Sequence, residues 1–319
     1  MNLRFRPLGR RIRSCVALAL LPIGILFAQA PQRPRILGIA HITFYAHDCR
    51  ESRAYYGDFL GLQEPYALKN TDGSPSKLFF KINDRQYVQI VPEREAGTDR
   101  LIDVGLETED AEALRVYLAS KAVKVPDRVH RDEIGNAVFD LTDPAGHLIE
   151  ITQYLPDGKT ALANGRYMGS SQLSARMEHI GFVVTNLDPE YKFYTEVLGF
   201  RDTYRGGRVG APVLSWINLS VSDGTDYIEL MLFKGMPDVK ALGSQHHLDL
   251  QVTDLGQAIA DLKAKPGYEA YRLGIDPHHI APNHRRQTNS FDPDGTRTEI
   301  MEPETLDGKP APTSPAPPP

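Results

Sequence analysis

Two histidines, 138 residues apart, open apolar segments that resemble buried strands. His41 begins "HITFYAHDCRESRAYYGDFLGL" (41–62) and His179 begins "HIGFVVTNLDPEYKFYTEVLGF" (179–200). Each segment continues into an aromatic-rich helical stretch that ends at a glycine, Gly61 or Gly199. An imidazole can carry a proton or bind a metal ion, so a polar ring at the head of a buried strand suggests a chemical role.

The stretch "HLDLQV" (247–252) alternates polar and apolar residues. Because successive residues of a strand point to opposite sides of a sheet, His247, Asp249 and Gln251 share one face. Glu229 and Glu299 lie in strand-like segments that alternate in the same way. One face of the second half is therefore predicted to carry imidazole and carboxylate groups.

Strand and helix signals repeat four times along the chain. Each unit reads as a strand, a helix and then several strands, which predicts an α+β fold of four βαβββ modules. The halves close alike, with "DPAGHLIEI" (143–151) and "DPDGTRTEI" (292–300). We expect one domain at 36–157, a linker at 158–176 and a second domain at 177–303.

This organisation resembles the vicinal oxygen chelate superfamily, which includes glyoxalase I, extradiol dioxygenases and bleomycin-binding proteins. In that superfamily, paired modules form a cup whose metal ligands come from the first and last strands of each module. The resemblance implies two tandem domains of this kind. It also implies a metal site in the second domain formed by His179, Glu229, His247 and Glu299.

Two imidazoles and two carboxylates suit a divalent cation such as Zn²⁺, Ni²⁺, Fe²⁺, Mn²⁺ or Co²⁺. A single histidine at a strand end is more often a hydrogen-bonded structural residue. Four ionisable groups around one cavity would be costly without a compensating cation, which favours metal binding. The equivalent positions of the first domain hold His41, Gln89, Asp103 and Glu150, so that domain is expected to have a degenerate site.

The resemblance implies a glyoxalase-like lyase or isomerase that acts on a small substrate with adjacent oxygens through an enediolate-like intermediate. Glu229 or Glu299 would move the proton. Two alternatives stay open: a binding protein without turnover, and an Fe(II)-dependent ring-cleaving dioxygenase that uses His179, His247 and Glu299. Extradiol enzymes usually carry a tyrosine where this chain has Asn289, which disfavours the dioxygenase.

A histidine- and arginine-rich stretch, 275–295, precedes the last predicted strand. Its residues His284, Arg285 and Arg286 could form a lid that holds an anionic substrate. A solvated loop rich in turn-forming residues is the other interpretation.

The two ends of the chain differ in composition from the rest. Residues 1–30 contain five arginines, an apolar run and "AQA" at 28–30, which predicts a cleaved export signal and a periplasmic or secreted protein. Cleavage would change the formal charge from −5 to −10, which argues against a nucleic-acid partner. After cleavage we expect no membrane association, and a monomer or homodimer. Residues 304–319 are proline-rich and predict a disordered tail.

Overall fold

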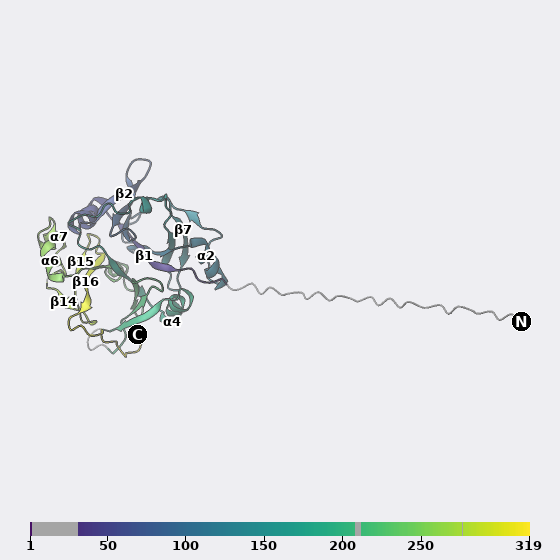
Figure 1. Ribbon diagram of the computed structural model, residues 1–319. Coiled ribbons are helices and arrows are strands. Elements are labelled where there is room, and N and C mark those ends of the chain that lie inside the picture. The colour runs from purple at the N-terminus through teal and green to yellow at the C-terminus, as the bar shows by residue number, and fades with distance from the viewer. Residues whose placement is uncertain (2–30, 208–211, 276) are drawn as a thin grey trace. The chain divides into compact units, whose positions relative to one another are not determined.

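The computed structural model of the protein describes Met1 and residues 31–207, 212–275 and 277–319. The predicted export signal therefore lies outside the described residues. The described chain folds into two eight-stranded sheets, one for each half (Figure 1). The prediction of four βαβββ modules paired into two domains is confirmed. None of the described helices is long and apolar enough to cross a membrane.

The first domain contains modules one and two. Module one consists of β1 (Ile36–Ala46), α1 (Cys49–Ser52), η1 (Arg53–Phe59), β2 (Gln63–Lys69), β3 (Pro75–Lys81) and β4 (Tyr87–Pro92). Module two consists of β5 (Leu101–Thr108), α2 (Ala111–Ser120), β6 (His130–Arg131), β7 (Ala137–Thr142) and β8 (Leu148–Gln153). A short helix, α3 (Lys159–Leu162), lies in the predicted linker.

The second domain repeats this order. Module three consists of β9 (Met177–Val184), α4 (Leu187–Lys192), η2 (Phe193–Val197), β10 (Arg201–Gly206), β11 (Trp216–Ser220) and β12 (Tyr227–Leu232). Module four is preceded by α5 (Val239–Gln245) and consists of β13 (His247–Gln251), α6 (Leu255–Lys263), α7 (Tyr268–Tyr271), β14 (His279–Ile280), β15 (Arg285–Phe291) and β16 (Arg297–Thr305).

The first and last strands of the modules form the centre of each sheet. The orders are β2-β3-β4-β1-β5-β8-β7-β6 and β10-β11-β12-β9-β13-β16-β15-β14. β1 and β5 are antiparallel neighbours, as are β9 and β13, while the last strand of each module runs parallel to its first strand. Residues on the four central strands of a sheet are therefore brought together although they are far apart in the sequence.

The segments after β1 and β9 are helical as predicted, and their second halves, η1 and η2, are π-helices. Both end before a glycine with positive φ, Gly61 at 78° and Gly199 at 76°, a conformation that glycine adopts without strain. These helices bury aromatic side chains, including Tyr56 and Tyr194, against the apolar faces of the strands. The opposite faces of the central strands are free to carry polar groups.

The C-terminal segment differs from the predicted disordered tail. The Ser314 N–H donates to the Arg205 carbonyl over 2.7 Å, and the Leu214 N–H donates to the Pro317 carbonyl over 2.7 Å. Arg205 belongs to β10, an edge strand with unpaired backbone groups, which gives the extended proline-rich segment a partner.

Candidate metal centre

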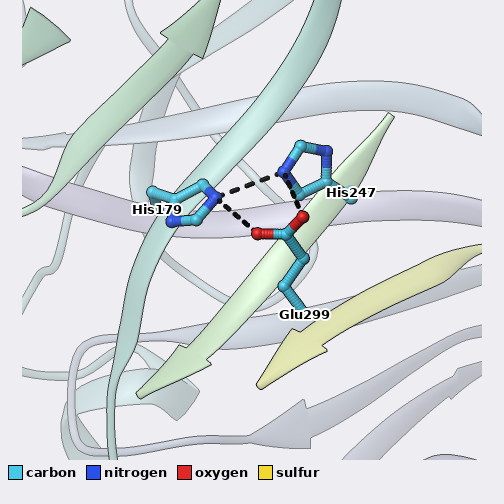
Figure 2. A group of neighbouring side chains, drawn as sticks. All are labelled: His179, His247 and Glu299. Atoms are coloured by element: carbon cyan, nitrogen blue, oxygen red, sulfur yellow. Dashed lines mark hydrogen bonds and ion pairs between the residues drawn. The ribbon is translucent and has the colours of Figure 1, made fainter. Parts of the chain in front are cut away.

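Three side chains from central strands of the second domain point toward one another (Figure 2). The Nε2 atom of His179 on β9 lies 3.2 Å from Nε2 of His247 on β13 and 3.5 Å from Oε2 of Glu299 on β16. His247 Nε2 lies 3.8 Å from Glu299 Oε1. The three ligand atoms lie within 4.8 Å of one another, and all three residues are buried. Two imidazole nitrogens and a carboxylate fit a divalent transition metal.

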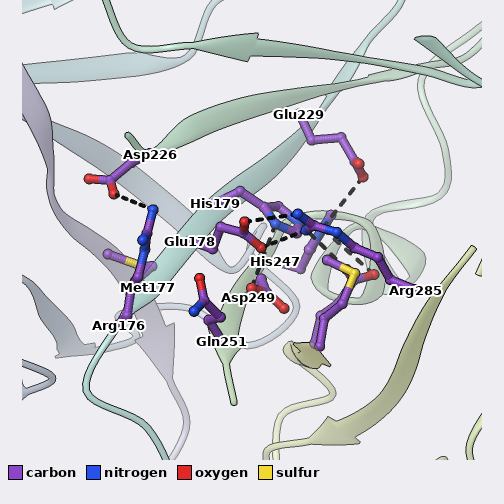
Figure 3. Close-up of polar contacts among 12 residues, drawn as sticks. Arg176, Met177, Glu178, His179, Asp226, Glu229, His247, Asp249, Gln251 and Arg285 are labelled. Carbon is purple, nitrogen blue, oxygen red and sulfur yellow. Dashed lines mark hydrogen bonds and ion pairs between the residues drawn. The ribbon is translucent and has the colours of Figure 1, made fainter. Parts of the chain in front are cut away.

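Glu229 on β12 is the fourth residue expected at this site. Its Oε1 atom lies 3.7 Å from His247 Nε2, and its side chain is 12% exposed. Glu229 is not part of the compact set of three, although it lies beside that set (Figure 3). The two carboxylates therefore differ in position. Glu299 faces both imidazoles, whereas Glu229 approaches only His247.

A glycine makes room for the His247 ring. Gly181 on β9 pairs with His247 on one side and with Glu229 on the other, and a Cβ atom at Gly181 would clash with the imidazole. His247 Nδ1 lies 2.7 Å from the Gln245 carbonyl, an acceptor that requires Nδ1 to carry the hydrogen. Nε2 then presents its lone pair toward His179 and Glu299, as a metal ligand must.

An arginine lies beside two of these groups. Arg297 Nη1 donates to Glu299 Oε1 over 2.6 Å, and Arg297 Nη2 lies 2.8 Å from His247 Nδ1. With Nδ1 donating to Gln245, the second contact cannot be a hydrogen bond, so Glu299 is the acceptor that holds the guanidinium. Arg297 is two residues before Glu299 and projects from the same face of β16.

The pKa values show how these charges interact. Burial and Arg297 lower the pKa of His247 well below its ordinary value. Burial also acts to lower the pKa of His179, but the contact with Glu299 and nearby carboxylates outweigh it and raise that pKa to about 9. Burial raises the pKa of Glu229 to about 7. Burial likewise opposes the charge of Glu299, but Arg297 and the protonated His179 outweigh it and hold its pKa well below the usual range.

A proton on His179 thus balances the buried carboxylates when no cation is present. A divalent cation among the same atoms would replace this proton, because metal binding requires neutral imidazole. The donor chemistry, the fixed tautomer of His247 and this charge balance all fit a metal ion.

A further carboxylate lies behind His179. Asp249 is fully buried, and neither of its oxygens has a hydrogen-bond partner among the described residues. Asp249 Oδ2 lies 3.8 Å from His179 Nδ1, on the side of the ring away from His247 (Figure 3). Burial raises the pKa of Asp249 well above its ordinary value. Asp249 is thus placed to orient the His179 ring, which also stacks on Tyr227 with centroids 4.6 Å apart.

The predicted anion-binding residues of the 275–295 stretch are engaged elsewhere. Arg285 Nη1 donates to Glu178 Oε2 over 2.8 Å (Figure 3), and Arg286 Nε donates to Glu302 Oε2 over 2.9 Å. His284 occupies a turn with φ of 63°. Both arginines are thus held in ion pairs. Neither of them, nor His284, lines the cavity beside Glu299.

Other residues of the 275–295 stretch line a cavity of about 290 Å³, to which Glu299 contributes and from which His179 and His247 are set back. Glu229, Glu299 and Arg297 form its polar wall. The remaining walls are contributed mainly by His279, Asn283, Gln287, Trp216, Met231 and Met301. Larger hollows of about 600 and 380 Å³ lie elsewhere and lack this set of ligands. The cavity beside Glu299 is consequently the one in which a small substrate would meet the metal.

The first domain brings together its corresponding residues differently. His41 Nε2 lies 3.1 Å from Asp103 Oδ1 and 3.8 Å from Glu150 Oε1. Thr43, which occupies the position of Gly181, donates to Asp103 over 2.6 Å and to Gln89 over 3.4 Å. The side chains satisfy one another, so this domain needs no cation to hold them together.

Little space remains beside these residues. The cavity next to His41 measures about 10 Å³ and is lined by aromatic rings, among them Tyr66, Phe79 and Tyr87. Burial acts to lower the pKa of His41, but Asp103 and Glu150 outweigh it and raise that pKa. The small cavity and the hydrogen bonds from His41 and Thr43 to Asp103 distinguish this site from that of the second domain.

Sequence reasoning missed three contributors to the second site: Arg297, Gln245 and the space at Gly181. Strand alternation placed Arg297 on the face of Glu299, which was the available signal. Gln245 acts through its backbone carbonyl, for which side-chain patterns give no indication.

The chain belongs to the glyoxalase/bleomycin resistance protein/dioxygenase superfamily, whose sequence model matches residues 38–151 and 176–300. The two matched regions coincide with the two eight-stranded domains. Members of this superfamily are typically metal-dependent enzymes. Among curated proteins, no sequence match was found.

Solved structures of two kinds are similar to this chain. The Mn(II)-bound glyoxalase from Novosphingobium aromaticivorans aligns with a TM-score of 0.65 and 20% identity, over 90% of this chain and 89% of that chain. The 2,3-dioxygenase LapB from Pseudomonas sp. KL28 aligns with a TM-score of 0.62 and 17% identity, over 88% and 97%. An extradiol ring-cleaving dioxygenase from B. fuscum aligns with a TM-score of 0.60 and 19% identity, over 89% and 76%. At these identities the comparison establishes the fold.

Proposed function

We propose that the second domain is the active site of a glyoxalase-like lyase or isomerase, which acts on a small substrate with adjacent oxygen atoms. The observation that carries the proposal is the convergence of His179, His247 and Glu299 beside a cavity whose wall also contains Glu229. Glu299, one of the three proposed ligands, and the separate carboxylate Glu229 thus face the same small volume.

His179, His247 and Glu299 would hold the metal, which would supply Lewis-acid polarisation of the substrate oxygens. Arg297 keeps Glu299 ionised and in place through its 2.6 Å hydrogen bond. Glu229, at the cavity wall, takes a proton from the carbon that bears the hydroxyl and returns it to the former carbonyl carbon, while the hydroxyl proton passes to the former carbonyl oxygen. Trp216, Met231 and Met301 exclude water from the reacting atoms.

The test measures proton transfer directly. Full-length protein is freed of metal, loaded separately with Mn²⁺, Ni²⁺, Zn²⁺, Co²⁺ or Fe²⁺, and mixed in D₂O with a panel of small α-hydroxy carbonyl compounds. We expect deuterium to appear at the carbon next to the carbonyl with at least one metal. Glu229→Gln should keep the metal and lose exchange by about 10²–10⁴-fold, whereas Glu302→Gln should retain it. Exchange that is unaffected by Glu229→Gln would contradict the proposed role.

A second candidate is an Fe(II) oxygenase, because two histidines and one carboxylate also make a facial triad. The structure pairs Asn289, rather than a tyrosine, with Glu299 across β15 and β16. Consumption of O₂ by the ferrous protein in the presence of catechols would favour this candidate. A metal-loaded protein that binds such ligands without exchange or O₂ consumption would instead support the binding-protein alternative.

We also propose that the protein is exported and that residues 1–30 are removed. The arginine-rich start, the apolar run and "AQA" at 28–30 support this proposal. Mass spectrometry of protein from fractionated native cells should give a mature form that begins near Pro31 outside the cytoplasm. An intact Met1 in the cytoplasmic fraction would contradict it.

A further inference from the structure

A second group of ligand-type side chains lies at the junction of the two domains. Asp143 and His147 belong to the turn between β7 and β8 of the first domain, and Glu190 belongs to α4 of the second. His147 Nδ1 lies 2.9 Å from Asp143 Oδ2 and 4.0 Å from Glu190 Oε1. One ligand atom from each residue lies within 4.8 Å of the other two. This junction cluster is separate from the site around His247.

The junction cluster is closed to solvent. Asp143 is 4% exposed and Glu190 is 0% exposed. The Glu190 Oε2 atom accepts the Ala145 N–H over 2.9 Å, which fixes the carboxylate beside the turn. Its other oxygen, Oε1, has no hydrogen-bond donor among the described residues, although it faces His147 and Asp143. A buried acceptor of this kind is costly unless a cation or a proton satisfies it.

The other domain junction offers an internal comparison. The Tyr194 hydroxyl donates to Asp143 Oδ2 over 3.1 Å, and the Tyr56 hydroxyl donates to Asp292 Oδ2 over the same distance. Each aspartate also accepts the backbone N–H four residues later over 2.8 Å, from His147 and Thr296 respectively. The turn and the tyrosine thus form the same contact at both junctions.

The two junctions differ at the positions of His147 and Glu190, and also at Ala145, where the second junction has Asp294. Thr296 replaces His147, and Ser52 replaces Glu190 at the matching helix position, 138 residues earlier. Ser52 donates to the backbone of its own helix, to the Asp48 carbonyl. The second carboxylate of that junction, Asp294, accepts the His47 N–H over 3.0 Å and lies 3.7 Å from Arg100, so it has partners that Glu190 Oε1 lacks among the described residues.

A second carboxylate beside Asp143 destabilises the junction unless its charge is compensated. Glu190 is fully buried, and its Oε1 atom faces Asp143 without a hydrogen-bond donor among the described residues. The negative charge of the pair must therefore be compensated within the cluster itself. A cation and a shared proton are two ways to satisfy the cluster, and a cation would also take His147 Nδ1, which lies 2.9 Å from Asp143 Oδ2, as a third ligand.

We propose that Asp143, His147 and Glu190 form a structural divalent-cation site that joins the first domain to the second. Two carboxylate oxygens and one imidazole nitrogen suit Zn²⁺ or Mn²⁺. The site is closed, as structural metal sites are, and it offers no cavity for a substrate. The cation would hold the β7–β8 turn on α4 and thereby fix the two domains relative to each other.

Metal stoichiometry tests the inference. The full-length chain is stripped with chelator, loaded with Zn²⁺ or Mn²⁺, desalted and examined by elemental analysis. Wild type should retain two equivalents, and His247→Ala should retain one. Glu190→Gln and His147→Ala should each retain one, and Glu190→Gln combined with His247→Ala should retain none. Glu107→Gln, which changes an equally buried carboxylate elsewhere, should retain two.

Thermal unfolding provides a second measurement. In the His247→Ala background, chelator should lower the melting temperature, and Glu190→Gln should abolish that chelator effect. A His247→Ala protein that folds, as judged by circular dichroism, but binds no metal would overturn the inference. Unchanged metal content in Glu190→Gln would also overturn it and would identify a shared proton instead. A wild-type protein that retains only one equivalent, lost in Glu190→Gln but kept in His247→Ala, would contradict the proposed active site and leave the junction site standing.

Discussion

At the scale of single residues, one exchange distinguishes the two domains. In the second domain Gly181 leaves room for the His247 ring, whereas the first domain has Thr43 and the shorter Asp103 at these two positions. Thr43 donates a hydrogen bond to Asp103, so in the first domain a hydrogen bond connects groups that a metal ion would connect in the second. The small residue Gly181 occurs together with the large His247 ring, and the larger Thr43 occurs together with the shorter Asp103. The second domain therefore has room for a second imidazole, and the first does not.

Gly181→Ala tests this dependence on space. The added methyl group would collide with the His247 ring, between two paired strands that cannot move apart easily. We expect metal affinity at this site to fall by about 10–100-fold, similar to the effect of losing groups that orient a ligand. The matched control is Gly235→Ala, since nothing lies within 4 Å of a Cβ atom there. Competition with a calibrated chelator gives the affinity, and equal affinity in both variants would refute the argument.

Glu299→Gln should affect the metal-free protein as well as the metal. The variant should lose the equivalent that depends on His247, and it would leave Arg297, 16% exposed, beside a neutral amide. Breaking a largely buried ion pair by removing one partner costs on the order of 3 kcal/mol. Urea unfolding in chelator should show this loss, and Glu299→Gln combined with Arg297→Ala should recover part of it. An unchanged unfolding free energy would show that the ion pair contributes nothing.

Strand alternation predicted the orientation of His179, His247 and Glu299, since parity alone fixes which face a strand residue takes. It could not predict that Arg285 and Arg286 pair with Glu178 and Glu302, because ion pairs depend on which strands become neighbours. The same limit concealed Glu190, whose partners belong to the other domain.

At the scale of elements, the central strands could be predicted and the edge strands could not. β9 and β13 are apolar and alternating, as buried strands are. β2 and β10 carry polar sequences such as "QEPYALK" and "RDTYRG", and they lie at the edges of their sheets. Edge strands face solvent on one side, so their sequences lack a clear pattern. β6 and β14 contain only two residues each, too few for any periodicity.

A buried glutamate on β5 makes stability depend on pH. Glu107 accepts a hydrogen bond from Arg85 Nε and lies near Asp226, and its burial raises its pKa to about 7. The folded state therefore holds a proton that the unfolded chain, with a pKa near 4.3, releases. This contribution to stability is complete below about pH 4 and is lost as the pH rises through about 7.

Glu107→Gln should remove this pH dependence. The unfolding free energy of the variant relative to wild type should rise by about 3 kcal/mol between pH 4 and pH 8. Exposed Glu109→Gln provides the baseline. The measurement is urea unfolding at several pH values, and a difference that stays constant with pH would show that Arg85 fully compensates the charge.

At the scale of the whole molecule, each domain closes onto the other through the same contact. The turn after β7 meets the helical segment α4–η2 through Tyr194, and the turn after β15 meets α1–η1 through Tyr56. The repeated "DP" turns predicted similar domains, but they gave no indication that each turn docks onto the other half. Only the folded chain shows that reciprocity, because the contacts span 51 residues at one junction and 236 at the other.

The C-terminal segment provides the last prediction. Ser314 and Pro317 form two backbone hydrogen bonds, with Arg205 on the edge strand β10 and with buried Leu214. Deleting residues 311–319 would remove both bonds and expose the edge of the sheet. At roughly 0.5–1.5 kcal/mol for each net hydrogen bond, the loss should be about 1–3 kcal/mol and lower the melting temperature by several degrees. Deleting residues 318–319 alone keeps both bonds and should leave the melting temperature unchanged. Equal melting temperatures for the two deletions would show that the proline-rich segment is as disordered as its composition suggests.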